Sequence, residues 1–572
     1  MRPFSLLSVL FLSVTIYATA ADFETATTAV KHMGLGWNLG NTLEASGHVA
    51  TTPSDPAYWG QQDLSSETYW GQFVTKPELM KMMKRAGFGA IRVPVTWYNH
   101  MDADANVNPA WMARVHEVVD YVVNQGMYCI INVHHDTGAD GDTFQSWLKA
   151  DEANYQQNRA RYEKLWQQIA MEFRDYGQLL LFESYNEMLD KYSSWCYASF
   201  ASPNRYDAAD ATSAYNAINS YAQSFVNTVR ATGGNNAQRN LIVNTYAAAN
   251  GYGDWSSHLV EPLTKLQKPE GETDHLAFEV HAYPTIADRS VTDIKKEVDG
   301  MINLLKSKLV SKGAPVIFGE WGTSNVDAEE TDYMKRPELM KQFCQYFVQQ
   351  CKASNIATFY WMGISDGAAR LFPAFSQADL ARWILQAYHG SSFDPVLPER
   401  SDYGTSCIAC TVDFQQQWSE FNLAQGSFTV RDYAQLILEL EEAPAAGLLE
   451  VKIYGKNTTS FKVTAASSTI AFNAQMGTIT RVTLQCMQPT GTTRVKNIWL
   501  VTRNGEKVPS DPSNYWGCTM RDIDVSYPAS IANNTLNTER STIRCFDLSG
   551  RPLQGPHRKG LFIINGKKLF VK

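Results

Sequence analysis

Eight short apolar runs alternate with longer amphipathic segments between Gly34 and about Tyr388, and this alternation constrains the fold more than any other feature. Continuous apolar runs without polar alternation are typical of parallel strands that are covered on both faces. The runs are Leu35–Leu39, Ala90–Val95, Tyr128–Val133, Leu179–Ser184, Leu241–Thr245, Leu276–Val280, Pro315–Phe318 and Ile356–Trp361.

The segments between the runs have the periodicity of helices that bury one face. Thr75-Lys76-Pro77-Glu78 has the pattern of a capping box with proline in the first turn, and Gly87 is the expected stop. Similar periodicity occurs in Tyr162–Phe173, Tyr215–Val229, Ile294–Leu309 and Leu339–Ala353. This order predicts an α/β fold, a closed (β/α)₈ TIM barrel. A doubly wound open sheet is the alternative, but no glycine-rich phosphate-binding sequence follows an early strand.

The chain changes character beyond the barrel. Ser391–Thr405 is rich in turn residues and indicates a linker. Short alternating segments then predict an all-β sandwich, with strands at Tyr433–Leu440, Leu448–Tyr454, Ser460–Ala465, Arg481–Cys486 and Lys496–Thr502. We therefore expect a signal peptide at 1–20, a barrel at 21–390, a linker at 391–410, a sandwich at 411–541 and a separate tail at 542–572.

Charge and cysteine content exclude several classes of partner. The net charge of −8 gives no reason to expect binding to nucleic acid. Met1–Ala20 has a basic start, an apolar centre and a small-residue cleavage site, which is typical of a secretory signal, and no later apolar stretch is long enough to be a transmembrane segment. Cys407-x-x-Cys410 lacks the second pair that a zinc ribbon needs. We expect no metal, no cofactor and a monomer.

Polar residues gather where the apolar runs end. In a barrel of this type, the carboxyl ends of the strands form the face that holds catalytic groups. Two glutamates at one such end, with arginine, histidine and tyrosine nearby, provide the acid and the carboxylate that glycosidic cleavage requires. The residues at these strand ends are Asn38, Arg92, His134, His135, Asn186, Glu187, His281, Tyr283, Glu320 and Trp361.

Six motifs in the same order resemble those of glycoside hydrolase family 5. They are Gly36–Thr42, Ile91–Trp97, Asn132–His135, Ser184–Glu187, His281–Tyr283 and Phe318–Gly322. The resemblance covers the whole predicted barrel and implies a retaining endo-β-glycanase. Met188 stands where the family often has proline after the first catalytic glutamate, which changes the loop rather than the chemistry.

The resemblance also implies roles for individual residues. Glu187 would be the general acid/base and Glu320 the nucleophile, with Asn186 bonded to the 2-hydroxyl of the sugar. Arg92 and Tyr283 would keep Glu320 ionised. The remaining substrate-binding residues would be His134, His135, His281, Trp361, Trp37 and Asn38.

The expected substrate is a β-1,4-glucan such as cellulose, mixed-linkage glucan or xyloglucan. An endo-β-1,4-mannanase is the main alternative within the same chemistry, and a non-catalytic glycan-binding protein is the alternative from another class. The sandwich has the size of carbohydrate-binding modules and carries the aromatic residues Trp418, Trp499, Tyr515 and Trp516. A purely structural role is the alternative. The tail segments Phe546–Arg551 and Lys559–Lys568 resemble the sorting signal of type IX-secreted proteins, which implies a secreted or outer-surface location.

Overall fold

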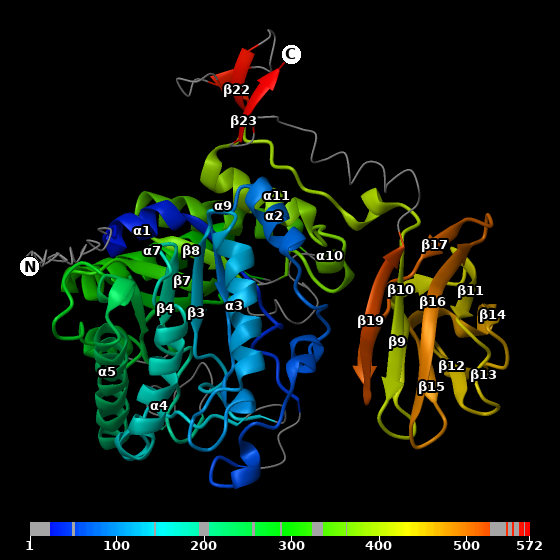
Figure 1. Ribbon diagram of the computed structural model, residues 1–572, viewed down its shortest axis with the longest axis horizontal. Coiled ribbons are helices and arrows are strands. Elements are labelled where there is room, and N and C mark those ends of the chain that lie inside the picture. Colours follow the sequence, from blue (N-terminus) through cyan, green and yellow to red (C-terminus); the bar gives the residue numbers. More distant parts are fainter. Residues whose placement is uncertain are drawn as a thin grey trace, which may run out of the picture. The chain divides into compact units, whose positions relative to one another are not determined.

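The computed structural model describes residues 23–47, 52–141, 145–193, 205–253, 258–286, 289–322, 336–361 and 363–526, with four short strands between 545 and 571 (Figure 1). The predicted signal peptide lies outside these residues. The chain forms two compact units. One extends to Asp366 and includes Gln377–Leu397, and the other comprises Gly367–Ser376 and the chain from Pro398 onward.

The first unit contains the predicted closed barrel of eight parallel strands, paired in chain order with β1 closing on β8. Every predicted apolar run supplies one strand. The strands are β1 (Leu35–Asn38), β2 (Ala90–Val93), β3 (Tyr128–Asn132), β4 (Leu180–Glu183), β5 (Leu241–Asn244), β6 (Leu276–Ala282), β7 (Val316–Trp321) and β8 (Ala357–Tyr360).

Helices connect the strands and surround them (Figure 1). Their buried stripes match the apolar periodicity of the sequence. The helices are α1 (Ala26–Met33), α2 (Pro77–Ala86), α3 (Pro109–Val123), α4 (Glu152–Glu172), α5 (Ala208–Ala231), α6 (Glu261–Lys265), α7 (Val291–Lys308), α9 (Pro337–Ala353) and α11 (Ala378–His389). A further short helix, α10 (Ala368–Leu371), belongs to the second unit.

The predicted capping box before α2 is not formed. Lys76 is the N-cap residue, and its side chain makes no cap hydrogen bond. The backbone N–H of Thr75 donates instead to Glu67, 2.7 Å away. Pro77 explains the difference, because the residue before a proline is held in an extended conformation and therefore lies just outside the helix.

The interior of the barrel is apolar near the amino ends of the strands. One hydrophobic cluster there joins α1 to side chains from several strands: Ala26, Ala29, Val30, Met33, Ala90, Tyr128, Ile130, Leu181, Ile242, Ala277, Ile317, Ala357 and Phe359. Because side chains alternate along a strand, Arg92 points to the same interior side as Ala90 but lies closer to the carboxyl end. Polar groups are thus confined to the carboxyl end of the barrel, above an apolar base.

The second unit contains a sandwich of two antiparallel sheets, as predicted. One sheet has the order β13-β12-β15-β10-β18 and the other β14-β11-β16-β9-β19, with β17 paired to β16. The strands are β9 (Cys407–Phe414), β10 (Glu420–Thr429), β11 (Tyr433–Leu440), β12 (Leu449–Tyr454), β13 (Thr459–Lys462), β14 (Ser467–Ala471), β15 (Thr478–Cys486), β16 (Gly491–Thr502), β17 (Lys507–Pro509), β18 (Ser513–Trp516) and β19 (Cys518–Ser526).

The described part of the tail forms its own antiparallel sheet of order β21-β20-β22-β23. Its strands are β20 (Cys545–Phe546), β21 (Pro552–Leu553), β22 (Gly560–Ile564) and β23 (Lys567–Val571). No helix in the described ranges is both long and apolar enough to span a membrane.

Candidate active site

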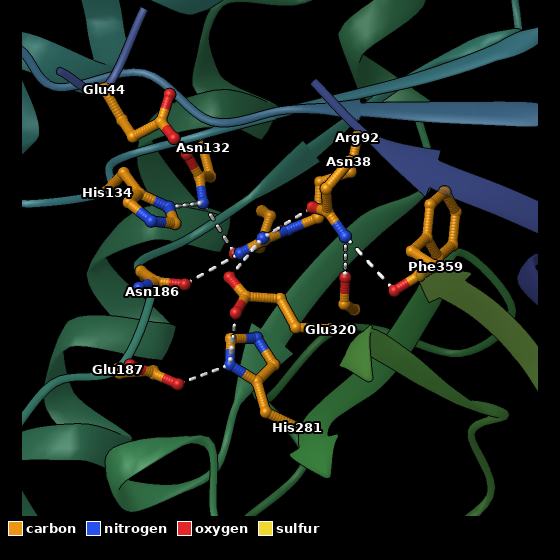
Figure 2. A network of polar contacts seen from close by, with 12 residues as sticks. Asn38, Glu44, Arg92, Asn132, His134, Asn186, Glu187, His281, Glu320 and Phe359 are labelled. Atoms are coloured by element: carbon orange, nitrogen blue, oxygen red, sulfur yellow. Dashed lines mark hydrogen bonds and ion pairs between the residues drawn. The ribbon is translucent and has the colours of Figure 1, made fainter. Parts of the chain in front are cut away.

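Arg92 is the centre of the polar network at the carboxyl end of the barrel (Figure 2). Its side chain is fully buried on β2. The guanidinium donates to both carboxylate oxygens of Glu183 at 2.6 and 2.8 Å, and to Glu320 Oε1 at 2.7 Å. It also donates to Asn38 Oδ1 at 3.0 Å and to Asn186 Oδ1 at 2.8 Å. One side chain therefore orients four residues, which come from β1, from β4 and the segment after it, and from β7.

Glu320 lies on β7 and is held at both carboxylate oxygens. Arg92 donates to Oε1, and the Tyr283 hydroxyl donates to Oε2 at 2.5 Å. Burial raises the pKa of Glu320, while the charge of Arg92 and the Tyr283 hydrogen bond act in the opposite direction. Arg92 and Tyr283 thus favour negative charge on Glu320, against the effect of burial.

Glu187 follows β4 and contacts His281 of β6. His281 Nδ1 lies 2.6 Å from Glu187 Oε1 and 3.5 Å from Glu320 Oε2 (Figure 2). Burial, followed by the nearby charge of Glu320, raises the pKa of Glu187 well above its usual range. One oxygen of Glu187, one oxygen of Glu320 and one nitrogen of His281 all lie within 4.8 Å of one another. The two carboxyl groups thus differ in environment although they are neighbours.

Two further glutamates lie below this pair, and our sequence analysis did not assign them to the site. Glu183 is the bidentate partner of Arg92. Glu279 is fully buried, with Oε1 3.2 Å from His281 Nε2 and 3.5 Å from Arg92 Nε. Each is an acid inside an otherwise apolar run, and Glu279 lies two residues before His281 on the same face of β6. That pattern is the signal that could have identified them.

The environments of the three histidines favour the neutral imidazole; His134 and His281 are buried and His135 is partly buried. Burial lowers the pKa of His135 to about 3 and lowers the pKa values of His134 and His281 well below their usual range. The ring of His134 lies parallel to that of Trp361, with centroids 6.1 Å apart, and its Nδ1 is 3.0 Å from Asn132 Nδ2. His135 packs against Trp70, with centroids 5.3 Å apart.

The structure separates the adjacent residues Trp37 and Asn38. Asn38 projects into the barrel, where Nδ2 donates to the Gly319 and Phe359 carbonyls at 2.9 and 3.1 Å. Trp37 is fully buried, and strand alternation directs it to the opposite side, toward the helix layer. The structure thus brings the other predicted residues together around Arg92 and excludes Trp37 from the group.

Within the described chain, one group of side chains is spaced to hold a metal ion, and it consists of Glu187, His281 and Glu320. In the structure these atoms are engaged with one another and with Arg92 and Tyr283. Two donors favour negative charge on Glu320, whereas burial and the neighbouring charge of Glu320 favour the protonated form of Glu187. That combination suits acid-assisted displacement at carbon.

Comparison with known proteins identifies relatives for the barrel. Residues 53–367 match the family model described as cellulase (glycosyl hydrolase family 5). Endoglucanase B of Neocallimastix patriciarum is 30% identical over 391 residues, which cover 66% of this chain and 73% of the relative. Endoglucanase A of Paenibacillus barcinonensis is 32% identical over 366 residues, which cover 57% of this chain and 83% of the relative.

Solved structures give the same result. A GH5-4 broad specificity endoglucanase from an uncultured bacterium is 65% identical with a TM-score of 0.60, and the match covers 64% of this chain and 97% of that one. A glycoside hydrolase family 5 enzyme from Prevotella bryantii B14, solved with a xyloglucan tetradecasaccharide, is 38% identical with a TM-score of 0.55, and the match covers 64% and 99%.

Proposed function

Because the chain belongs to glycoside hydrolase family 5 and is therefore a glycoside hydrolase, we propose that it is an endo-β-1,4-glucanase that acts by a retaining double displacement. The observation that carries this proposal is the short distance between Glu187 and Glu320: one carboxylate oxygen of Glu187 lies within 4.8 Å of one carboxylate oxygen of Glu320. Retaining enzymes have carboxyl groups about 5–5.5 Å apart, whereas inverting enzymes leave about 6.5–9.5 Å for a water molecule.

In the first step Glu320 attacks the anomeric carbon. A carbon–oxygen bond to Glu320 forms while the glycosidic carbon–oxygen bond breaks, and Glu187 gives its proton to the leaving oxygen. The Arg92 and Tyr283 donors hold the Glu320 carboxylate in place for this attack. The products are a glycosyl ester on Glu320, an ionised Glu187 and a shortened glycan.

In the second step a water molecule releases the sugar. Glu187 accepts a proton from the water, whose oxygen attacks the anomeric carbon as the bond to Glu320 breaks. The Arg92 guanidinium fixes the Asn186 amide through Oδ1, which makes Nδ2 the donor for the 2-hydroxyl of the reacting sugar. His134, His135, His281, Asn38 and Trp361 complete the surroundings of the bond that is cleaved.

The proposed substrates are β-glucans, including cellulose, mixed-linkage glucan and xyloglucan. Two similar proteins support this range of substrates. The protein that is 65% identical is a broad specificity endoglucanase, and the Prevotella bryantii enzyme was solved with a xyloglucan oligosaccharide. A preference for mannan would instead indicate the endo-β-1,4-mannanase alternative.

A panel of polysaccharides tests both the reaction and the residues. Wild type should release reducing sugar from carboxymethylcellulose, lichenan and xyloglucan faster than from mannan, and Glu187→Ala and Glu320→Ala should each lose most of this activity. Glu78→Ala is the matched control, since this glutamate is 54% exposed on α2. Unchanged hydrolysis by Glu187→Ala would refute the assigned site, and binding without hydrolysis by wild type would indicate a non-catalytic protein.

Trapping the intermediate tests the mechanism separately. A 2-fluoro cellobioside should label the peptide that contains Glu320, and the first product should retain the β configuration by NMR. A label on another peptide, or an inverted product, would contradict the double displacement.

The sandwich has a surface suited to sugar, and we include glycan binding by this unit in the proposal. Trp418, Tyr515 and Trp516 are 49%, 46% and 49% exposed. Trp516 pairs with Glu420 across the β10–β18 ladder, so the two side chains share a face. Glu420 accepts hydrogen bonds from neighbouring side chains of that face, namely Lys452, Tyr454, Thr483 and Gln485.

Flat exposed rings beside hydrogen-bonding groups are the features that bind sugar rings. Full-length Glu320→Ala should be retarded in gels containing β-glucan, and the added change Trp516→Ala should reduce the retardation. Equal mobility of the two proteins would favour a purely structural sandwich.

Action outside the cell is the last part of the proposal. Its support is the signal-like residues Met1–Ala20 and the sorting-like tail at 542–572. Cell fractionation of the source organism should recover the activity from the outer surface or the medium, and a cytoplasmic location would contradict it.

A further inference from the structure

Glu279 is a buried carboxyl group that the mechanism above does not use. It lies on β6, two residues before His281, so both side chains project into the barrel. Oε1 is 3.2 Å from His281 Nε2, and the other nitrogen of the same ring is 2.6 Å from Glu187 Oε1. A carboxyl–imidazole–carboxyl chain therefore connects the interior of the barrel to the proposed acid.

The space for this carboxyl group is created by Gly319, the residue before Glu320. A Cβ atom at position 319 would lie 1.6 Å from Glu279 Oε1. The position of the Glu279 carboxyl group thus depends on a neighbouring residue without a side chain. Glu279 is packed against the strand that bears the nucleophile, and it has little freedom to move away.

The charges around Glu279 favour its neutral form. Arg92 is within 4 Å of three carboxylates, at 2.6 Å from Glu183, 2.7 Å from Glu320 and 3.5 Å from Glu279. One cation cannot compensate three buried anions, and the most distant of them gains least from it. Burial and the charge of Glu183 accordingly raise the pKa of Glu279 well above its usual range. The titratable and charged groups facing this cluster are Arg92, Glu183, Glu187, His281 and Glu320, with His134 beside them.

The proton of a neutral Glu279 has two possible positions. It can be donated from Oε1 to His281 Nε2, 3.2 Å away, or toward the neighbouring Glu183 carboxylate. Both oxygens of Glu183 already accept hydrogen bonds, from Arg92 and Asn132, so Glu183 has less need of a further donor than the imidazole nitrogen has. The geometry therefore favours the proton on Oε1, pointing at the imidazole.

We propose that Glu279 is a positioning residue: as a neutral acid it donates to His281 Nε2, so that the imidazole carries its hydrogen on Nδ1 and donates to Glu187 Oε1. This inference rests on the role of Glu187 as general acid. With Oε1 of Glu187 occupied as an acceptor, the catalytic proton resides on Oε2, where it can be transferred to the glycosidic oxygen. The opposite tautomer would accept that proton on Nδ1 and hold it away from the substrate.

The same hydrogen bond serves both steps of the proposed reaction. When Glu187 is ionised after the first step, the Nδ1–H of His281 donates to a carboxylate instead of a carboxylic acid. No proton leaves His281 or Glu279 at any point. Glu279 thus acts through His281 and does not itself touch the substrate.

Substrates with different leaving groups test this role. Dinitrophenyl β-cellobioside needs no acid for departure of its leaving group, whereas β-glucan does, and kcat/KM reports the first step for both. Glu279→Leu should lower kcat/KM for β-glucan about 100-fold, which is within the range expected when general acid catalysis is lost. The kcat/KM for the dinitrophenyl substrate should change less than about threefold. The dinitrophenyl rate also reports that the variant is folded. Equal losses on both substrates, or no loss on either, would overturn the proposal.

Glu279→Gln is the conservative variant that separates a neutral acid from an anion. Its amide N–H can replace the proposed O–H donor to His281 Nε2, so activity on β-glucan should stay within about fivefold of wild type, and the alkaline limb of the pH profile should not move. If Glu279 were ionised, removal of its charge would lower the pKa of Glu187, and the alkaline limb would shift to lower pH. That shift, or a loss as large as that of Glu279→Leu, would overturn the proposal.

Glu187→Ala is measured alongside to keep the two hypotheses apart. It should show the same selective loss on β-glucan, because it removes the acid itself. If Glu187→Ala loses both activities equally, the assignment of Glu187 fails, whatever the result for Glu279.

Discussion

Arg92 shows how one buried cation can organise several carboxyl groups. Its planar fork donates in several directions at once, to the two oxygens of Glu183, to Glu320 and to two amides. A lysine has the same charge but cannot match this geometry. The position therefore requires the shape of the guanidinium as well as its charge.

Arg92→Lys should accordingly lower kcat/KM by about 100-fold or more and destabilise the fold by about 3 kcal/mol, because it leaves buried carboxyl groups without their donors. Initial rates on β-glucan and urea unfolding measure the two effects. Arg159→Lys is the control, since this arginine is 57% exposed on α4. A fully active and stable Arg92→Lys would show that charge alone is sufficient.

The Tyr283 hydroxyl makes a different contribution, which pH can reveal. Its bond to Glu320 Oε2 favours the ionised carboxylate and lowers the pKa of Glu320. Tyr283→Phe removes this donor, so the pKa should rise and the acid limb of the kcat/KM profile should move to higher pH. The activity at the optimum should fall about tenfold or more. An acid limb that stays in place would mean that Glu320 is not the group that titrates there.

At the scale of strands, the site depends on the close approach of β6 and β7. Their register shifts between Val280 and His281, which brings His281 beside Glu320. Gly319 leaves the space for the Glu279 carboxyl group, which any side chain at this position would overlap. The shift and the glycine occur together at the point where Glu320 and His281 lie side by side.

Gly319→Ala should therefore impair both folding and activity. The added Cβ would lie 1.6 Å from Glu279 Oε1, so the buried Glu279 carboxyl group must be displaced from its partners. We expect destabilisation of about 2–3 kcal/mol or more from overpacking and a marked loss of kcat. Thermal unfolding measures the loss of stability, and β-glucan hydrolysis measures the loss of activity. Gly177→Ala is the control, because an added Cβ there meets nothing within 4 Å. Equal behaviour of the two variants would contradict the close approach.

The sequence predicted the barrel strands more completely than it predicted the residues of the site. The barrel strands are buried on both faces, so each appears as an apolar run whose position needs no knowledge of its partners. Arg92, Glu187 and Glu320 follow the same logic, as polar groups at or near strand ends. Glu183 and Glu279 were missed, because their roles depend on partners that are distant in sequence. Trp37 was misjudged, although adjacent residues of a strand cannot both face the interior.

For the whole molecule, the division into units does not follow the order of the chain. Gly367–Ser376, between β8 and α11, belongs to the unit that otherwise begins at Pro398. Within that unit, the Phe375 N–H donates to the Pro398 carbonyl at 2.7 Å, and the Tyr403 hydroxyl donates to the Pro373 carbonyl at 2.9 Å. The guanidinium of Arg400 also lies 3.7 Å above the Phe372 ring. This segment is therefore held by residues that follow the barrel.

Two truncations test this dependence. A chain that ends after Leu397 loses the contacts to Gly367–Ser376, whereas one that ends after Ser406 retains the Pro398, Arg400 and Tyr403 contacts. The longer chain should unfold at a temperature several degrees higher and hydrolyse β-glucan faster, because the segment after β8 and Trp361 stays ordered. Identical melting temperatures would show that the barrel does not need these residues.

The interleaved boundary also limits how such a chain can be rearranged during evolution. A recombination event that exchanged only the chain from residue 398 onward would keep the ten residues Gly367–Ser376 but lose the residues that hold them. A recombined gene that keeps an ordered loop after β8 must either transfer Gly367–Ser376 together with the chain from Pro398 onward, or place the junction after Tyr403. The catalytic half and its neighbour should therefore be inherited together more often than modules joined by a simple linker.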